Sequence, residues 1–409
     1  MPTFDPSMVR SHVWNLEGMR LKTQRENSAR GTGERNGAAS RRMGVAMALG
    51  VAVLAWPAFG QLNALPEGLP KALQIGASEE QQIAEYVKAN SGKLMDADAK
   101  AREKDRSALV APFGQTGVST AFRIAYEAKV SAILGDLLKS DNEAIVLNAV
   151  VIAGELATDK SAGLIRTASG HASEPVRTQA AVAARRTFEA MQSSPVAISA
   201  QAAADLAKLV GDRLAKETSG YAVDAWMKAG FAGATVTRSE TPMLRSQAIS
   251  AIRAGLSSRA DVGGDAVLEP LVLQAALRAC VELRNQVAGV NSAPALNSAG
   301  AKDAAALAGH VIAHAGRVTA KAGFAKAANE AGAREAYAQL LNAAEMVVVA
   351  ASGVVDPTRT IAQRKIGDAL KAATARDDAA VVTNCREFVG SDGLLSRSPW
   401  DLRGQFKSP

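Results

Sequence analysis

Apolar side chains recur along most of the chain at the three- and four-residue spacing of an amphipathic α-helix. The pattern is clearest between residues 119 and 190. There, one apolar face consists of Ile133, Leu134, Leu137 and Leu138, a turn follows at Ser140-Asp141-Asn142, and the next face consists of Val146, Val150, Val151 and Leu156. The sequence therefore predicts helices that follow one another through tight turns.

Capping residues mark further helix boundaries. Ser78, followed by two glutamates, suits a helix start, because its hydroxyl can accept from the first N–H groups and the acids favour the positive end of the helix dipole. Glu174-Pro175 suits another, since a proline in the first turn loses no intrahelical hydrogen bond. The last predicted helices span residues 302–328, 333–351, 357–374 and 378–389.

Several of these helices resemble one another. Residues 174–181 read Glu-Pro-Val-Arg-Thr-Gln-Ala-Ala, and residues 269–276 read Glu-Pro-Leu-Val-Leu-Gln-Ala-Ala. Residues 244–249 carry the same glutamine and alanine, preceded by a proline. A helical pair inserted at about 197–231 accounts for the longer interval in the middle. The chain therefore contains an internal repeat, the signature of stacked helical units.

The repeat fixes a helical phase that can be tested. Spacings of four, three and one place Val176, Ala180, Ala183 and Ala184 on one side of a helix, which we expect to face the core. Thr178 is predicted to point away, as is its counterpart Leu273. Small side chains on the core face allow a neighbouring helix to approach closely.

This pattern resembles HEAT-like repeats of the short, armadillo-type kind, with about 30 residues per unit. The resemblance rests on the helix from Asp141 to Leu156 and on Glu174-Pro175-Val176-Arg177, which look like the family's acid-x-x-Val-Arg-x-x-Ala-Ala signature. It implies an all-α fold of α-solenoid type with a C-terminal helical region. It also implies that Arg177 and Arg245 are structural and pair with acids of neighbouring repeats. Leu147 and Val272 depart from the signature, so such a ladder would be interrupted.

The pattern divides the chain into successive segments. We predict a polar and disordered leader at 1–42, the hydrophobic region of a signal peptide at 43–60, a linker at 61–77, HEAT-like repeats at 78–288, a C-terminal helical region at 301–390 and a flexible tail at 391–409. The break near residues 289–300 is rich in Gly, Asn, Ser and Pro.

The N-terminal segment has the order of a secretory signal. Arg41 and Arg42 precede the uncharged run 43–56, and Ala58-Phe59-Gly60 follows with small residues at its first and third positions. We expect cleavage between Gly60 and Gln61, and a periplasmic or extracellular protein. The run is shorter than the roughly 20 residues of a membrane span. An uncleaved membrane anchor at 43–60 is the alternative, and neither the export route nor the true start codon is decided by the sequence.

Composition favours helix and disfavours nucleic-acid binding. Alanine, the best helix former, is abundant, and aromatic residues make up only 4%. The net charge of +7 belongs mostly to residues 1–60, with eight Lys/Arg and four Asp/Glu, so the remainder carries +3. A nucleic-acid-binding domain would need a basic patch on its folded part. Cys280 and Cys385 lack metal-ligand spacing; they are expected to be buried, and a disulfide between them stays an alternative.

The sharpest candidate for chemistry is a histidine pair. His310 and His314 are four residues apart and share a helix face, as two ligands of one metal would. Asp303, Arg317 and Lys321 share that face, which favours a solvated stripe, and Val311 stands where a metalloprotease motif has glutamate. We therefore expect no metal, no cofactor and near-neutral alanine variants of both histidines. His171 falls in a turn and is expected at the surface.

The sequence as a whole favours a non-catalytic scaffold that binds other proteins, because stacked helices present long surfaces rather than an enclosed pocket. It names no partner. Two alternatives remain: an enzyme that uses a metal held by His310 and His314, and a structural envelope component anchored by residues 43–60.

Overall fold

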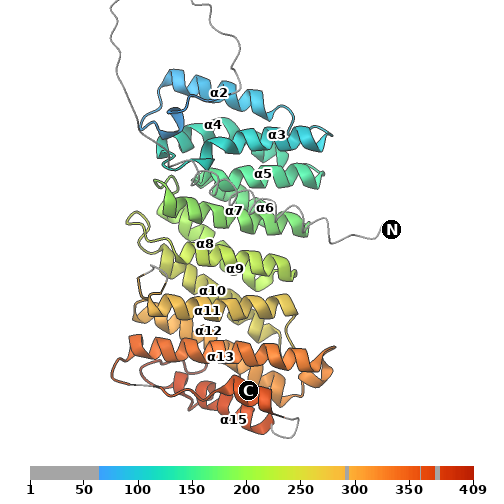
Figure 1. Ribbon diagram of the computed structural model, residues 1–409, viewed down its shortest axis with the longest axis vertical. Coiled ribbons are helices and arrows are strands. Elements are labelled where there is room, and N and C mark those ends of the chain that lie inside the picture. Colours follow the sequence, from blue (N-terminus) through green and yellow to red (C-terminus); the bar gives the residue numbers. More distant parts are fainter. Residues whose placement is uncertain (1–63, 291–293, 360, 374–377) are drawn as a thin grey trace, which may run out of the picture. The chain divides into compact units, whose positions relative to one another are not determined.

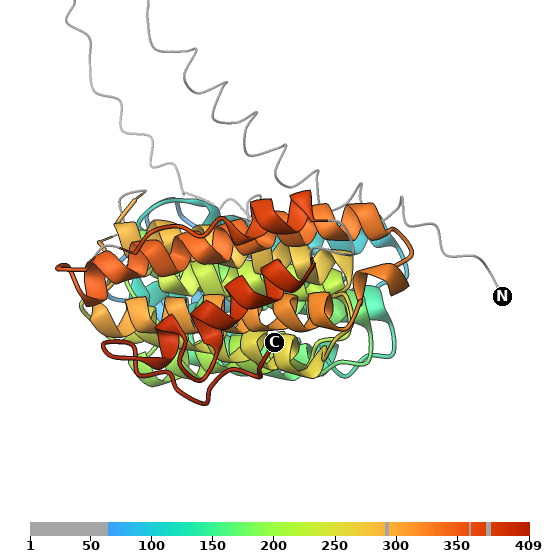
Figure 2. The same cartoon turned by 90° about the horizontal axis from the view of Figure 1, so that it is seen from below.

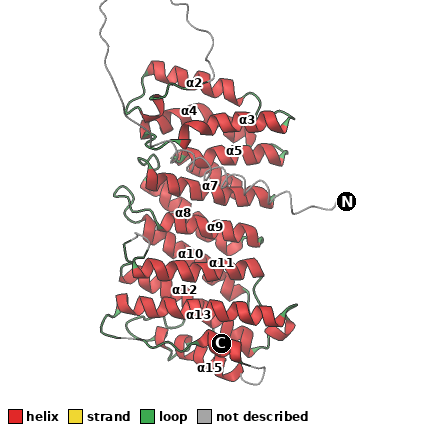
Figure 3. Cartoon of the chain, viewed as in Figure 1, coloured by secondary structure: helices red, strands yellow, loops and turns green. Residues whose placement is uncertain are grey.

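The computed structural model describes residues 64–290, 294–359, 361–373 and 378–409. Helical residues make up 71% of this part, which contains fourteen α-helices and no strand (Figure 3). The all-α prediction is confirmed for the described residues. The predicted leader, signal region, cleavage flank Ala58, Gly60 and Gln61, and start of the linker lie outside them.

The α-helices follow one another through short loops (Figure 1). They are α2 (Ala77–Ser91), α3 (Ala99–Val110), α4 (Thr120–Leu137), α5 (Glu143–Leu156), α6 (Asp159–Ser169), α7 (Glu174–Ser193), α8 (Ala200–Lys216), α9 (Gly220–Ala234), α10 (Leu244–Val262), α11 (Pro270–Ala288), α12 (Ser298–Ala320), α13 (Glu330–Val355), α14 (Ile366–Ala372) and α15 (Asp378–Val389). Four 3₁₀ turns accompany them: η1 (Leu69–Lys71), η2 (Ala111–Gly114), η3 (Phe324–Lys326) and η4 (Leu394–Ser396).

Contacts between helices define two layers. Layer A contains α3, α5, α7, α9, α11 and α13, each in contact with the next, and layer B contains α2, α4, α6, α8, α10, α12 and α15 in the same manner. Successive helices of the chain alternate between the layers (Figures 1 and 2). The end of each layer-B helix from α4 to α12 therefore lies beside the start of the next layer-A helix. We call this side the B-to-A edge.

Small residues let neighbouring helices approach closely. Val176, Ala180, Ala183 and Ala184 of α7 are all buried, so the predicted helical phase is confirmed. A Cβ at Gly154 of α5 would come within 2.8 Å of the Ala183 backbone. Leu273 is wrongly predicted to point away: it is only 5% exposed, because α11 packs against both α9 and α13.

The C-terminal helices differ from prediction in their bounds. α12 spans Ser298–Ala320 instead of 302–328, and α13 spans Glu330–Val355 instead of 333–351. The helix expected from residue 357 begins at Ile366 instead. Glu345 of α13 is buried, and its carboxylate accepts the backbone N–H groups of Arg364, Lys365 and Ile366, which holds the preceding residues in a loop. At the other end of the described chain, α2 begins at Ala77 with Gly76 as its N-cap, so Ser78 is not the cap.

The segment after α15 is not a flexible tail. Leu395, Trp400, Leu402 and Pro409 are buried, and the segment folds back against α12 (Figure 2). A loose tail was expected because polar residues dominate the sequence of this segment. In the structure, a few apolar side chains anchor it. One hydrophobic core runs from Leu69 to Leu402, and α11 and α12 are in contact with each other.

One described helix, α13, is long and apolar enough to cross a membrane by length and composition. Half of the apolar window is buried inside the protein, where Tyr337, Leu341 and Val348 pack into the core. Burial of this kind is what a central helix of an all-α protein shows.

Candidate functional site

Three residues of the predicted α12 stripe are buried, contrary to the solvated face expected for them, whereas Asp303 is half-buried and Lys321 is exposed. His310, His314 and Arg317 are 7%, 1% and 8% exposed. This part of the stripe is covered because α12 packs against α10, α13 and α15, and the segment 391–409 folds over it. Helical spacing places these residues on one face, and it does not reveal what covers that face.

His310 faces α10 and the C-terminal segment. Its Nδ1 atom lies 3.3 Å from the carboxylate of Asp261, and its ring meets the Phe406 ring edge-on with centroids 5.1 Å apart. Burial lowers the pKa of His310, and the Asp261 carboxylate partly offsets that effect. The imidazole is thus a buried partner of Asp261.

His314 takes part in a chain of hydrogen bonds that passes through Tyr337 of α13. The backbone N–H of Leu268 donates to the Tyr337 hydroxyl at 3.0 Å, so the hydroxyl proton is free to donate to Nε2 of His314 at 2.9 Å. Burial and the nearby Arg317 lower the pKa of His314 to about 4, so the ring is neutral at pH 7.

These contacts turn the two rings toward different partners. Nε2 of His314 would have to give up the Tyr337 hydroxyl before it could bind a metal. In the described part of the chain, no group of three or more His, Cys, Asp or Glu side chains is placed to hold a metal ion. Cys280 and Cys385 are free and fully buried, which raises the pKa of each thiol to about 12.

Arginines recur at one position in layer B, a signal that the sequence analysis missed. Five layer-B helices carry arginine three residues before their last residue: Arg166 in α6, Arg213 in α8, Arg259 in α10, Arg317 in α12 and Arg386 in α15. The intervals between them are unequal because the helices and loops differ in length, so a search at a fixed offset does not find them.

Three of these arginines tie a helix to the end of its layer-B predecessor; we call them the arginine ties. Arg213 donates to the Ser169 hydroxyl at 3.1 Å, and Arg259 donates to the carbonyl of Leu214. Arg317 donates to the carbonyls of Ala260 at 2.8 Å and Gly264 at 3.3 Å. Carbonyls at a helix C-terminus lack intrahelical partners, so a cation there satisfies both hydrogen bonding and the dipole.

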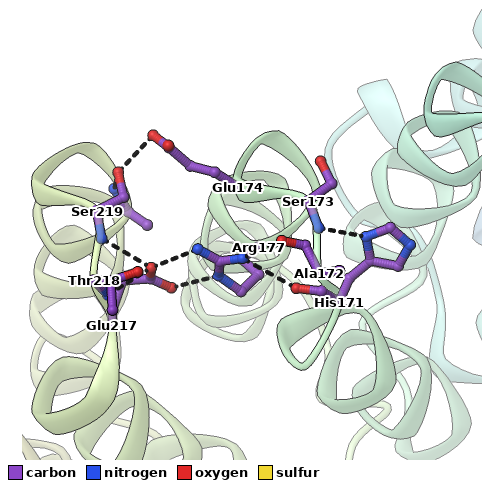
Figure 4. A network of polar contacts seen from close by, with 9 residues as sticks. His171, Ala172, Ser173, Glu174, Arg177, Glu217, Thr218 and Ser219 are labelled. Atoms are coloured by element: carbon purple, nitrogen blue, oxygen red, sulfur yellow. Dashed lines mark hydrogen bonds and ion pairs between the residues drawn. The ribbon is translucent and has the colours of Figure 1, made fainter.

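A second set of contacts joins layer-A helices along the same edge (Figure 4). Arg177 of α7 forms two hydrogen bonds of 2.9 Å with Glu217, which precedes α9. Burial alone would raise the pKa of Glu217, but Arg177 and the N–H groups of Ser219 and Thr218 hold it below its usual range. The expected pairing of Arg177 with a neighbouring acid is confirmed, and the acid is Glu217, just before the next layer-A helix. Arg245 instead donates to the Gln286 amide at 2.6 Å.

Cap residues extend this network. The Ser219 hydroxyl, N-cap of α9, donates to Glu174 at the start of α7 at 2.5 Å, and Ser173, N-cap of α7, donates to Glu143 of α5. His171 is half-buried: its Nδ1 accepts the N–H of Ser173, and its carbonyl accepts from Arg177. The caps of α7 and α9 thus each contact the acid that opens the preceding helix of layer A.

Compared with known proteins, the chain matches no family model and no curated protein sequence.

Proposed function

We propose that this protein is an α-solenoid of HEAT-like type that acts, without catalysis of its own, as a scaffold for other proteins. The observation that carries the proposal is the recurrence of the arginine ties and of the Ser–Glu cap contacts at matching positions of successive helix pairs. Recurrent contacts between neighbours are the physical basis of a repeat array. Such ties hold neighbouring helices in fixed relation, and a surface ordered before binding loses less entropy when a partner docks.

The chemistry of the described residues supports a binding role over an enzymatic one. The candidate histidines are committed to Asp261 and to Tyr337, and both cysteines are buried thiols. Nucleic acid is not proposed as a partner, since the chain beyond residue 60 carries a net charge of only +3.

We further propose that the protein acts after export, in the periplasm or outside the cell. The support is sequence order: Arg41-Arg42, the apolar run 43–56 and the small residues of Ala58-Phe59-Gly60. Contact with a membrane is proposed only for a chain that keeps residues 43–60.

Site-specific photo-crosslinking in the native source tests the scaffold proposal. A crosslinking residue replaces Lys208, exposed on α8 of layer B, and in a matched variant replaces Lys228, exposed on α9 of layer A. We expect a discrete crosslinked protein from one layer and a much weaker product from the other, because a partner docks on one surface. Equal, diffuse products from both positions, or none from either, would contradict the proposal.

A further inference from the structure

Residues 400–409, here called the strap, follow η4, lie across α12 and contain no regular secondary structure (Figure 2). Phe406 packs on Gly309 of α12, and Pro409 packs on Gly316, two turns further along the same helix. A Cβ at either glycine would collide with the strap: at Gly316 it would lie 2.5 Å from the Pro409 ring. The two glycines therefore let the side chains of Phe406 and Pro409 lie directly on the α12 backbone; we call these two contact positions the side-chain beds. We call the surface of α10, α12 and α15 beneath the strap the strap groove.

Polar groups of the groove bind mainly the strap's backbone. Arg317 Nη1 donates to the carbonyl of Lys407 at 3.0 Å, and Arg386 donates to the oxygen of Pro409 through Nε at 3.1 Å and Nη2 at 3.0 Å. Because these guanidinium groups bind carbonyl oxygens, they do not depend on which side chains the bound segment carries. Selectivity is left to the beds of Phe406 and Pro409.

The start of the strap is anchored in the core, because Trp400 and Leu402 are 3% and 8% exposed. Beyond Leu402, the side chains of Arg403, Gln405, Lys407 and Ser408 are exposed, Phe406 is half-buried and Pro409 is buried. Lys407 adds one bond, from Nζ to the carbonyl of Asp261 at 2.9 Å. Residues 403–409 have no regular structure and bury few apolar side chains, so this part of the strap opens at lower free energy than the helices beneath it.

Backbone hydrogen bonds for affinity and two side-chain beds for selectivity are the recognition pattern of a peptide-binding groove. We propose that the strap groove binds an extended segment of a partner protein with the pattern Phe-x-x-Pro, and that the strap is its intramolecular, displaceable occupant. This inference rests on the proposed scaffold function and names the partner chemistry that one of its surfaces selects.

Displacement can be measured on the full chain with a labelled peptide of residues 400–409. In the wild type, the strap competes at the high effective concentration of a tethered segment. Phe406→Ala weakens that competitor and leaves the groove unchanged. Fluorescence anisotropy should show the peptide binding the Phe406→Ala protein at least about 10-fold more tightly than the wild type. Gln405→Ala, a neighbouring exposed position, is the matched control and should behave as the wild type.

Two further arms settle the groove's selectivity. A peptide with alanine in place of phenylalanine should bind neither protein, and Gly309→Leu combined with Phe406→Ala should abolish binding of the native peptide. A folded Phe406→Ala protein that binds no peptide would overturn the proposal. Loss of its helical circular dichroism signal would also overturn it, because the strap would then be an indispensable part of the core. Concentration-dependent dimers would assign the groove to a second copy of the chain instead.

The scaffold proposal has a separate readout. Failure of the peptide to bind, together with a discrete crosslink from layer A or layer B, would refute the groove alone. Absence of both would refute the scaffold as well.

Discussion

At the scale of the residue, arginine suits the end of a layer-B helix because its fork of donors reaches several carbonyls at once. Arg317 shows this most fully, with backbone oxygens of Ala260, Gly264 and Lys407 around one guanidinium. Lysine has three donors on one nitrogen and cannot span that arrangement. The tie therefore depends on the shape of the group as well as on its charge.

Arg317→Lys should accordingly destabilise the protein by about 1–3 kcal/mol, because buried carbonyls lose their donors. Arg166→Lys is the matched control, since Arg166 holds the same helical position but its side chain is more than half exposed and its guanidinium lies 3.8 Å from the Asp205 carboxylate. Its effect should stay within about 0.5 kcal/mol. Urea unfolding of both variants measures the difference, and equal losses would show that the carbonyl contacts of Arg317 carry no stability.

His314 makes stability depend on pH. Its pKa is lowered by burial to about 4 from the usual 6.5, so between these values the unfolded chain binds a proton that the folded chain does not. The stabilisation is complete above pH 6.5 and is lost as pH falls toward 4. The loss from this site approaches about 3 kcal/mol. His310, whose pKa is also lowered by burial, adds a contribution of the same sign.

Urea unfolding at pH 7 and pH 4.5 tests this dependence. His314→Gln should be less stable than the wild type at pH 7, because the Tyr337 contact is altered, and its stability should fall less between the two pH values. This replaces the expectation of a neutral alanine variant, which assumed an exposed ring. A slope unchanged by the substitution would mean that His314 does not titrate in this range.

At the scale of the element, local sequence predicts the bounds of some helices, whereas the burial of their faces depends on tertiary contacts. The bounds of α15 match the predicted 378–389, because the apolar period lies within that segment. The burial of His310 could not be read in the same way. It depends on Phe406, almost a hundred residues away, and helical periodicity carries no information about such a contact. The late start of α14 has a similar cause in Glu345 of another helix.

Close approach at α7 gives an element-scale prediction. Ala180 is fully buried, so Ala180→Leu should cost about 1–3 kcal/mol through overpacking. Ala275 of α11, equally buried, should respond alike to the same change. Thr178→Leu should cost less than either, because Thr178 is only half-buried. Denaturant melting of the three variants ranks them, and a larger loss at Thr178 would refute the helical phase shared by the repeat.

At the scale of the whole molecule, export leaves a chemical mark at the N-terminus. If the signal is processed as its residues indicate, protein purified from its native source should begin at Gln61. Sequential degradation of the N-terminus reads this directly. A first residue of Met1, with the protein recovered from the cytoplasm, would contradict export, whereas a membrane-bound protein that retains residues 43–60 would support the anchor.

The strap also influences the order in which the helices unfold. At one end, α2 and α3 contact only their immediate neighbours and carry long charged faces, so little holds them beyond α4 and α5. At the other end, Arg386 of α15 and Arg317 of α12 are both bonded to the strap, so α15 cannot peel away without releasing it. Opening should therefore begin at α2 and travel toward α15. Backbone amides should therefore exchange with deuterium fastest in α2 and α3. The helices at that end would open transiently while α12 and α15 stay folded.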